Sequence, residues 1–153
     1  MINQLQIERT LAIIKPDAVM AGNCGKILSM IENSGLEIVA MKMAILDKSD
    51  AMRFYSVHTG KYFFERLVNF ITSGKIIAIA LQGDHAIERW RTLMGATDPA
   101  EAAEGTIRHL YGTFINKNCV HGSDSPDTAH AEIDFFFTEH DFVPSNIQQS
   151  TKE

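Results

Sequence analysis

The sequence predicts an α/β (α+β) sandwich, in which helices cover a β-sheet. Short apolar runs typical of buried strands alternate along the chain with longer segments whose apolar residues recur at helical spacing. The chain has 153 residues, of which 45% are hydrophobic and 22% charged, the balance of an ordinary globular domain. We find no internal repeat or linker, so residues 1–153 are expected to form a single domain.

The first part of the chain predicts a strand, a helix and a second strand. Residues 9–14 are expected to form a buried strand, which ends at Pro16 because proline cannot donate to a central ladder. Residues 36–46 are apolar and partly β-branched, which favours a second strand. The helix between them has one apolar face, a possible N-cap before it and a glycine after it: Cys24, Ile27, Leu28 and Ile31, then Asn23 and Gly35.

The middle of the chain predicts two helices, a strand and another helix. A helical region opens at Ser49, with Met52 and either Tyr55 or Val57 facing inward. Residues 76–81 are expected to form a third buried strand, and residues 84–94 a helix that ends at Gly95. The second helix of this part is expected to end at Gly74 and to carry four apolar residues: Phe63, Leu67, Phe70 and Ile71.

Two pairs of a polar residue followed by proline mark turns in the last third of the chain. Asp98-Pro99 begins a short turn that runs through Glu104, and Ser125-Pro126 is typical of an N-cap followed by the first residue of a helix. The phenylalanines at 135–137 also allow a strand, but the cap and the spacing favour a helix. The polar residues 145–153 are expected to form a loose tail.

Charge and composition weigh against several classes of function. The net charge of −5 disfavours a broad surface for nucleic acid or for an anionic membrane. No apolar stretch approaches the roughly 20 residues that span a bilayer, and the N-terminus has no basic, apolar leader. Cys24 and Cys119 suggest no disulfide framework, which favours a reducing compartment and a cytoplasmic protein.

The common nucleotide-binding and metal-binding motifs are missing. Residues 22–26 end in Gly-Lys, but their glycines are too close together for a P-loop, and there is no GxGxxG or GxSxG. Cys119 and His121 have no further ligands at zinc-site spacing, so no metal site is expected.

The densest polar cluster spans residues 118–125, and its residues allow two interpretations. It is either a turn that leads into a helix capped by Asp124 or Ser125, or a site in which His121 is a nucleophile or acid-base group. Glu132 lies two turns into that helix and can fold back toward the turn. Three cations beside turns would suit a polyphosphate, although their spacing does not show that they converge: Lys15, Arg91 and Arg108.

Residues 118–125 closely resemble the active-site motif N-x-x-H-G-S-D-S of the nucleoside diphosphate kinases. The resemblance extends over residues 7–140 and includes further matching segments: 8–11, 14–18, 67–68, 73–74, 94–100 and 105–108. It implies a ferredoxin-like fold, with a four-stranded antiparallel sheet covered by helices. That fold requires a short fourth strand at or before His121, where the residues alone suggest a loop.

The resemblance implies transfer of the γ-phosphate from a nucleoside triphosphate to a nucleoside diphosphate, through a phosphohistidine at His121 in a ping-pong mechanism. Ser123 and Glu132 would hold the imidazole, and Lys15 would be both catalytic and substrate-binding. Phe63 would stack on the base, which implies a broad nucleotide range. The remaining residues would contact phosphates or sugar: Tyr55, Arg91, Thr97, Arg108 and Asn118. Without the resemblance, Tyr55 and Phe63 are ordinary core aromatics.

The resemblance also implies Mg²⁺ carried by the nucleotide phosphates and a homo-oligomer built from dimers. Lys61-Tyr62 stands where the family usually has Arg-Pro, and Leu110 where many members have aspartate. The alternatives are a catalytically silent nucleotide-binding protein with a regulatory role, or a nucleic-acid-binding module, which the net charge disfavours. The other histidines match no catalytic position and are interpreted as structural or surface residues: His58, His85, His109, His130 and His140.

Overall fold

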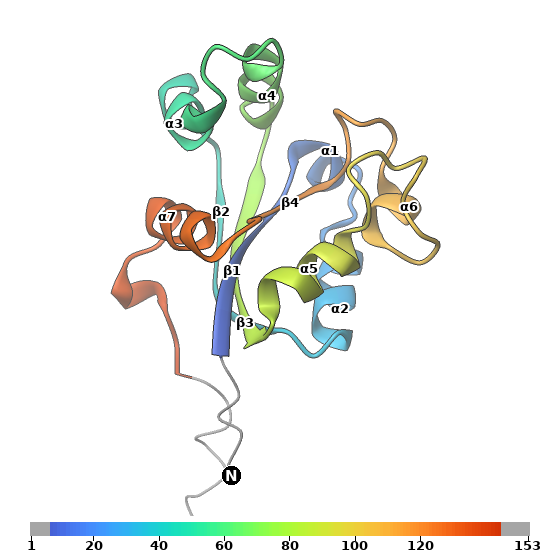
Figure 1. Ribbon diagram of the computed structural model, residues 1–153, viewed down its shortest axis with the longest axis vertical. Helices are drawn as coiled ribbons and strands as arrows, with labels where there is room; N and C mark the ends of the chain where they lie inside the picture. The colour runs from blue at the N-terminus through green and yellow to red at the C-terminus, as the bar shows by residue number, and fades with distance from the viewer. Residues whose placement is uncertain (1–6, 145–153) are drawn as a thin grey trace, which may run out of the picture.

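A computed structural model describes residues 7–144 and contains one four-stranded sheet (Figure 1). The strands lie in the order β2-β3-β1-β4, and every neighbouring pair is antiparallel. Their bounds are Ile7–Ile14 for β1, Glu37–Ala44 for β2, Ile76–Asp84 for β3 and Val120–Gly122 for β4. The predicted α/β sandwich, with a ferredoxin-like antiparallel sheet, is confirmed.

β1 and β3 are buried on both sides because helices cover both faces of the sheet. Alternate side chains of β1 enter different cores: Leu11 and Ile13 pack on one side, and Ala12 and Ile14 on the other. The first core is covered by α3 (Lys48–Phe54), α4 (Phe64–Ile71) and α7 (Pro126–Phe136). The second is covered by α2 (Cys24–Asn33) and α5 (Ala86–Met94), which lie across the sheet from α7 (Figure 1).

The long elements lie where the sequence places them. The predicted strands at 9–14, 36–46 and 76–81 correspond to β1, β2 and β3, and the helix at 84–94 corresponds to α5. Gly35 and Gly95 follow their helices with φ of 84° and 87°, a left-handed conformation that glycine adopts without strain. The helical interpretation of the phenylalanine run is confirmed for Phe135 and Phe136, while Phe137 follows α7 in an extended conformation. The Ser125 hydroxyl accepts a hydrogen bond from the Thr128 N–H and caps α7, as predicted.

Several shorter elements differ from the prediction. Residues 120–122 form β4 rather than a loop, because they pair with the edge of β1 and place His121 opposite Ile13. Two five-residue helices were not predicted, α1 (Pro16–Met20) and α6 (Ile107–Tyr111), since each is too short to show a helical period. Single-turn 3₁₀ helices η1 (Ser56–His58) and η2 (Glu139–Asp141) were not predicted either. Residues 98–104 form turns, as predicted.

The helix ends around α3 and α4 are shifted from the predicted ones. Asp47, not Ser49, precedes α3 as its N-cap and accepts from the Asp50 N–H, while α4 ends at Ile71, short of Gly74. Tyr55 faces inward as expected, but Met52 and Val57 are 47% and 79% exposed. Asn23 precedes α2 without a side-chain capping bond.

In residues 7–144 no helix has the length and apolar character needed to cross a membrane. The expected loose tail at 145–153 lies outside the described residues.

Candidate active site

His121 lies in the middle of β4, where neighbouring elements fix its backbone. His121 pairs with Ile13 of β1, and its carbonyl accepts a hydrogen bond of 3.1 Å from the indole N–H of Trp90 in α5. The next residue is Gly122, where an added Cβ would lie 2.7 Å from Trp90 Cδ1 and 2.6 Å from Met94 Cε. The glycine after His121 therefore allows α5 to pack directly against the strand.

The imidazole of His121 is paired with the carboxylate of Glu132. Its Nε2 lies 2.9 Å from Glu132 Oε1, and the two side chains are only 20% and 13% exposed. The Ser123 hydroxyl donates to the same carboxylate oxygen at 2.8 Å and accepts from the Leu11 N–H at 3.3 Å. Because a carboxylate only accepts, this network assigns the ring proton to Nε2 and leaves Nδ1 unprotonated in the neutral imidazole.

The side chain of Asn118 connects two further segments of the chain near His121. Lys15 Nζ donates to Asn118 Oδ1 at 2.9 Å, and Asn118 Nδ2 donates to the carbonyl of Thr97 at 3.0 Å. Between Asn118 and β4, Cys119 has a φ of 73°, a conformation that non-glycine residues seldom adopt. Asp17 Oδ2 accepts from the Cys119 N–H at 3.1 Å, which holds this turn in place.

The guanidinium of Arg108 is buried against the same turn. It donates to the carbonyls of Asn118, Val120 and Gly95 at 3.3, 2.9 and 3.0 Å. These bonds fix the guanidinium of Arg108 against the backbone of β4. The sequence does not show this contact, because the acceptors are main-chain carbonyls.

Burial changes the proton affinity of the two buried cations. Burial, and next the charge of Arg108, lowers the pKa of Lys15 to about 8. Burial, and next the charge of Arg91, lowers the pKa of Arg108 to about 10. Both groups therefore carry their charge at neutral pH at a cost, and a bound polyanion would reduce that cost.

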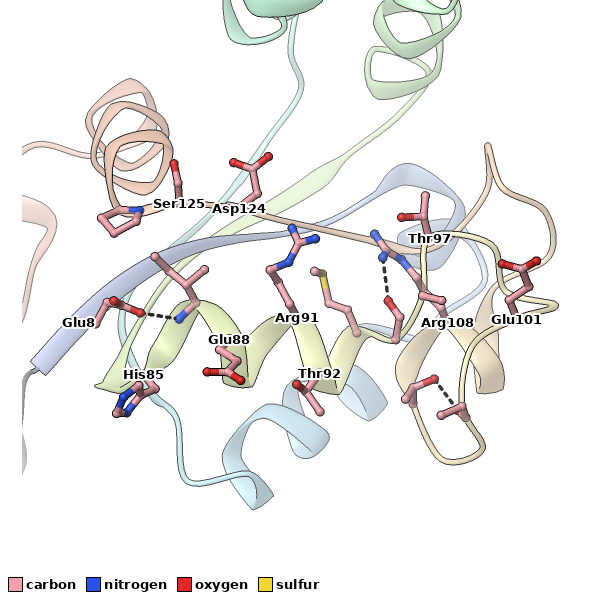
Figure 2. Close-up of a pocket in the computed structure, with 17 residues that line it drawn as sticks. Glu8, His85, Glu88, Arg91, Thr92, Thr97, Glu101, Arg108, Asp124 and Ser125 are labelled. Atoms are coloured by element: carbon pink, nitrogen blue, oxygen red, sulfur yellow. Dashed lines mark hydrogen bonds between the residues drawn. The ribbon is translucent and has the colours of Figure 1, made fainter.

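A cavity of about 750 Å³ lies between α5, the loop before α6 and the start of α7 (Figure 2). Three predicted phosphate-binding residues line it, namely Arg91, Thr97 and Arg108. Figure 2 shows Arg91 extending from α5 toward Asp124, which also lines the cavity together with Ser125. The sequence suggests Asp124 only as a possible helix cap, and its place within the N-x-x-H-G-S-D-S motif was the available signal for a role here.

The predicted aromatic residues lie apart from this cavity. Tyr55 is 6% exposed, and burial, with a smaller contribution from the Glu132 charge, raises the pKa of its hydroxyl. Phe63 is half-buried and packs against Tyr62 and His58, with ring centroids 5.3 Å apart in both pairs. The structure thus brings Tyr55 close to Glu132, while Phe63 has no ring contact with His121 among the described residues.

Two residues beside His121 were missed by the sequence analysis. The ring of Phe54 lies 5.4 Å from the imidazole of His121. Burial and the charge of Lys61 lower the pKa of His58, which also lies within range of the charges of Asp124, His121 and Glu132. Neither residue shows a signal in the sequence, since helical spacing marks them only as part of the region after Ser49.

Cys119 is buried, and that burial raises the pKa of its thiol to about 12, so the thiol is not a nucleophile at neutral pH.

Comparison with known proteins decides the family. The family described as "Nucleoside diphosphate kinase" matches residues 8–142. The chain belongs to this family. A protein from Protochlamydia amoebophila named "Nucleoside diphosphate kinase 2" is 50% identical over 137 residues, covering 90% of this chain and 96% of the relative. A nucleoside diphosphate kinase from Burkholderia mallei is 52% identical over 135 residues, covering 88% and 96%. The predicted assignment as an enzyme, a phosphotransferase of the nucleoside diphosphate kinase type, is confirmed.

Solved structures of the family share the fold. A nucleoside diphosphate kinase from Aquifex aeolicus superimposes with a TM-score of 0.88 at 44% identity, covering 90% of this chain and 99% of the other. A halophilic nucleoside diphosphate kinase from Halobacterium salinarum, in complex with CDP, gives a TM-score of 0.87 at 41% identity, covering 91% and 93%.

Proposed function

We propose that this enzyme moves the γ-phosphate of a nucleoside triphosphate to a nucleoside diphosphate through a phosphohistidine at His121. The observation that carries the proposal is the pair between His121 Nε2 and Glu132 Oε1, 2.9 Å apart. This pair leaves Nδ1 as the nucleophilic nitrogen and gives the ring a partner for the positive charge that it gains on attack.

The reaction divides into two similar steps. In the first, the lone pair of His121 Nδ1 forms a bond to the γ-phosphorus, the bond to the bridging oxygen breaks, and its electron pair leaves with the diphosphate. The ring becomes positively charged, and the Nε2–H donates to Glu132, which Ser123 holds by a hydrogen bond of 2.8 Å. In the second step an oxygen of another diphosphate attacks the phosphorus, and Nδ1 departs with its electron pair.

The cations stabilise the negative charge of the phosphates during both steps, and positioning rather than covalent assistance supplies most of the rate. Both Lys15 and Arg108 donate to Asn118, Lys15 to the side-chain oxygen and Arg108 to the main-chain carbonyl. Arg91 and Thr97 line the cavity from which phosphates would reach them. In this proposal Tyr55, which lies outside that cavity and near Glu132, contacts the phosphate or sugar.

Phe63 is assigned to the base. It is half-buried, so one part of the ring can pack on protein and the rest on a ligand. An aromatic platform accepts every base because each base has a π-face, and this supports a broad nucleotide range.

Mg²⁺ is proposed to enter with the nucleotide. Among residues 7–144 no three His, Cys, Asp or Glu side chains gather to hold a metal ion, so the phosphates are the expected ligands. Phosphate oxygens are the ligands that Mg²⁺ prefers, and the ion would neutralise part of their charge when bound. No step above depends on a protein ligand to the ion.

We also propose that the protein forms a homo-oligomer built from dimers and is located in the cytoplasm, where the two free thiols of Cys24 and Cys119 stay reduced. Exchange of labelled γ-phosphate between ATP and a second nucleoside diphosphate tests the proposed mechanism. Exchange that His121→Ala abolishes supports the phosphohistidine, whereas exchange that persists in this variant contradicts it.

A further inference from the structure

The ring of Phe54 packs edge-on against the imidazole of His121. Phe54 is the last residue of α3 and is half-buried. Its ring centroid lies 5.4 Å from that of His121, with the ring planes at 68°. This T-shaped geometry is the favourable one for aromatic pairs, whereas a face-to-face stack is not.

The same ring also packs against the helix that carries Glu132. Phe54 lies 5.5 Å from both Phe135 and Phe136. These two follow Glu132 by three and four residues on α7, so all three share one face of that helix. Phe54 therefore contacts the nucleophile of β4 and the turn that holds its carboxylate partner in α7.

One hydrogen bond does not fix the plane of an imidazole ring. The terminal torsion of histidine is broad, so the ring can turn about the direction of its bond to Glu132 unless packing prevents it. Such a rotation moves Nδ1 away from the phosphorus, and small misplacements of reacting atoms cost large factors in rate.

We propose that Phe54 is a positioning residue that fixes the ring plane of His121, so that Nε2 stays on Glu132 while Nδ1 faces the phosphate. The inference rests on the proposed role of His121. It assigns Phe54 no contact with nucleotide, because the ring acts only through the imidazole and α7.

The test compares Phe54→Leu with a matched control, Phe135→Leu. Phe135 is also half-buried and packs on Phe54 and Phe136, but it has no ring contact with His121. Phe54→Tyr keeps the ring and serves as the conservative rescue, and Phe54→Met fills the space without a ring if the leucine variant does not fold.

We expect Phe54→Leu to slow single-turnover phosphorylation by saturating Mg-ATP about tenfold, with the Kd for ADP within twofold of wild type. The nitrogen chemical shifts of His121, read by NMR without nucleotide, should move from one tautomer toward an average of two. Phe54→Tyr should restore both readouts, and Phe135→Leu should change neither.

Two results would overturn the inference: a wild-type phosphorylation rate in Phe54→Leu, or an equal loss in Phe135→Leu, which would show a general effect of the aromatic cluster. The proposed function fails separately. If wild-type protein is never phosphorylated on His121, the kinase mechanism is wrong, yet the NMR comparison still reports whether Phe54 holds the ring in the orientation that keeps its proton on Nε2.

Discussion

Replacing Glu132 with glutamine is the sharpest perturbation of the proposed mechanism. The amide has nearly the same shape, and its oxygen can still accept the hydrogen bond that Ser123 donates at 2.8 Å. What it loses is the negative charge 2.9 Å from His121 Nε2. The substitution therefore tests whether the charge matters, separately from the packing of α7.

The structure sets the size of the effect. The two side chains are 20% and 13% exposed, so solvent screens their interaction only in part. A hydrogen bond to a charged group contributes about 1.5–3 kcal/mol, compared with about 1 kcal/mol for a neutral one. The expected loss is the difference, about 0.5–2 kcal/mol, or about 2- to 30-fold in rate at 1.4 kcal/mol per factor of ten. The positive charge on the ring develops only during attack, so the loss should appear in kcat and not in nucleotide affinity.

Rapid-quench measurement of phosphate transfer from labelled ATP gives the rate constant, and fluorescence of the single tryptophan, Trp90, gives nucleotide affinity beside His121. Asp134→Asn is the matched control on the same helix, since Asp134 pairs with His130 at 3.3 Å on the surface, with 66% and 82% exposure. A Glu132→Gln variant with unchanged kcat and a raised KM would refute the orienting role. So would a control variant that slowed the enzyme equally.

Three further predictions follow from single features of the site. Affinity for ADP should fall as pH rises above about 8, and the fall should approach tenfold per pH unit. The reason is that Lys15 binds phosphate in its protonated form, and burial lowers its pKa to about 8. Titration of the Kd from pH 7 to 9 checks this, and Lys15→Arg should give a flat profile. Phe63→Ala should weaken ADP and CDP binding alike, by the roughly 1–3 kcal/mol of one stacked base, as measured by calorimetry; a loss confined to one base would contradict a simple platform. Gly122→Ala should lower the free energy of unfolding by about 1–3 kcal/mol, because the added Cβ overpacks against Trp90. Gly25→Ala is the control and should not lower it, since nothing lies within 4 Å of its added Cβ. Thermal denaturation of both variants measures the difference.

The long elements could be predicted because each repeats its pattern several times. The strand at 76–81 is continuously apolar, and the helix at 84–94 shows a clear face and ends at a glycine. The three residues of β4 are too few to show such a pattern. The left-handed conformation of Cys119 before them is also not visible in the sequence. Only pairing with β1 makes them a strand, and that pairing is a property of the folded chain.

The candidate site divides in the same way. The motif at 118–125 was sufficient to single out His121 and Ser123, and the helical position of Glu132 suggested that it could fold back. The contact of Phe54 with His121 joins α3 to β4 across the first core, and no spacing in the sequence encodes it. The three carbonyls around Arg108 were equally hidden, because main-chain acceptors leave no residue type to recognise.

The most direct test of the mechanism is the chemical identity of the phosphorylated enzyme. Wild-type protein is incubated with Mg-ATP and no acceptor, and bound phosphate is measured with its acid stability and its position in the chain. We predict one phosphate per chain, located on His121, released by acid and removed by any added nucleoside diphosphate. Phosphate that survives acid, that lies on Ser123 or Ser125, or that remains after diphosphate is added would contradict the phosphohistidine mechanism.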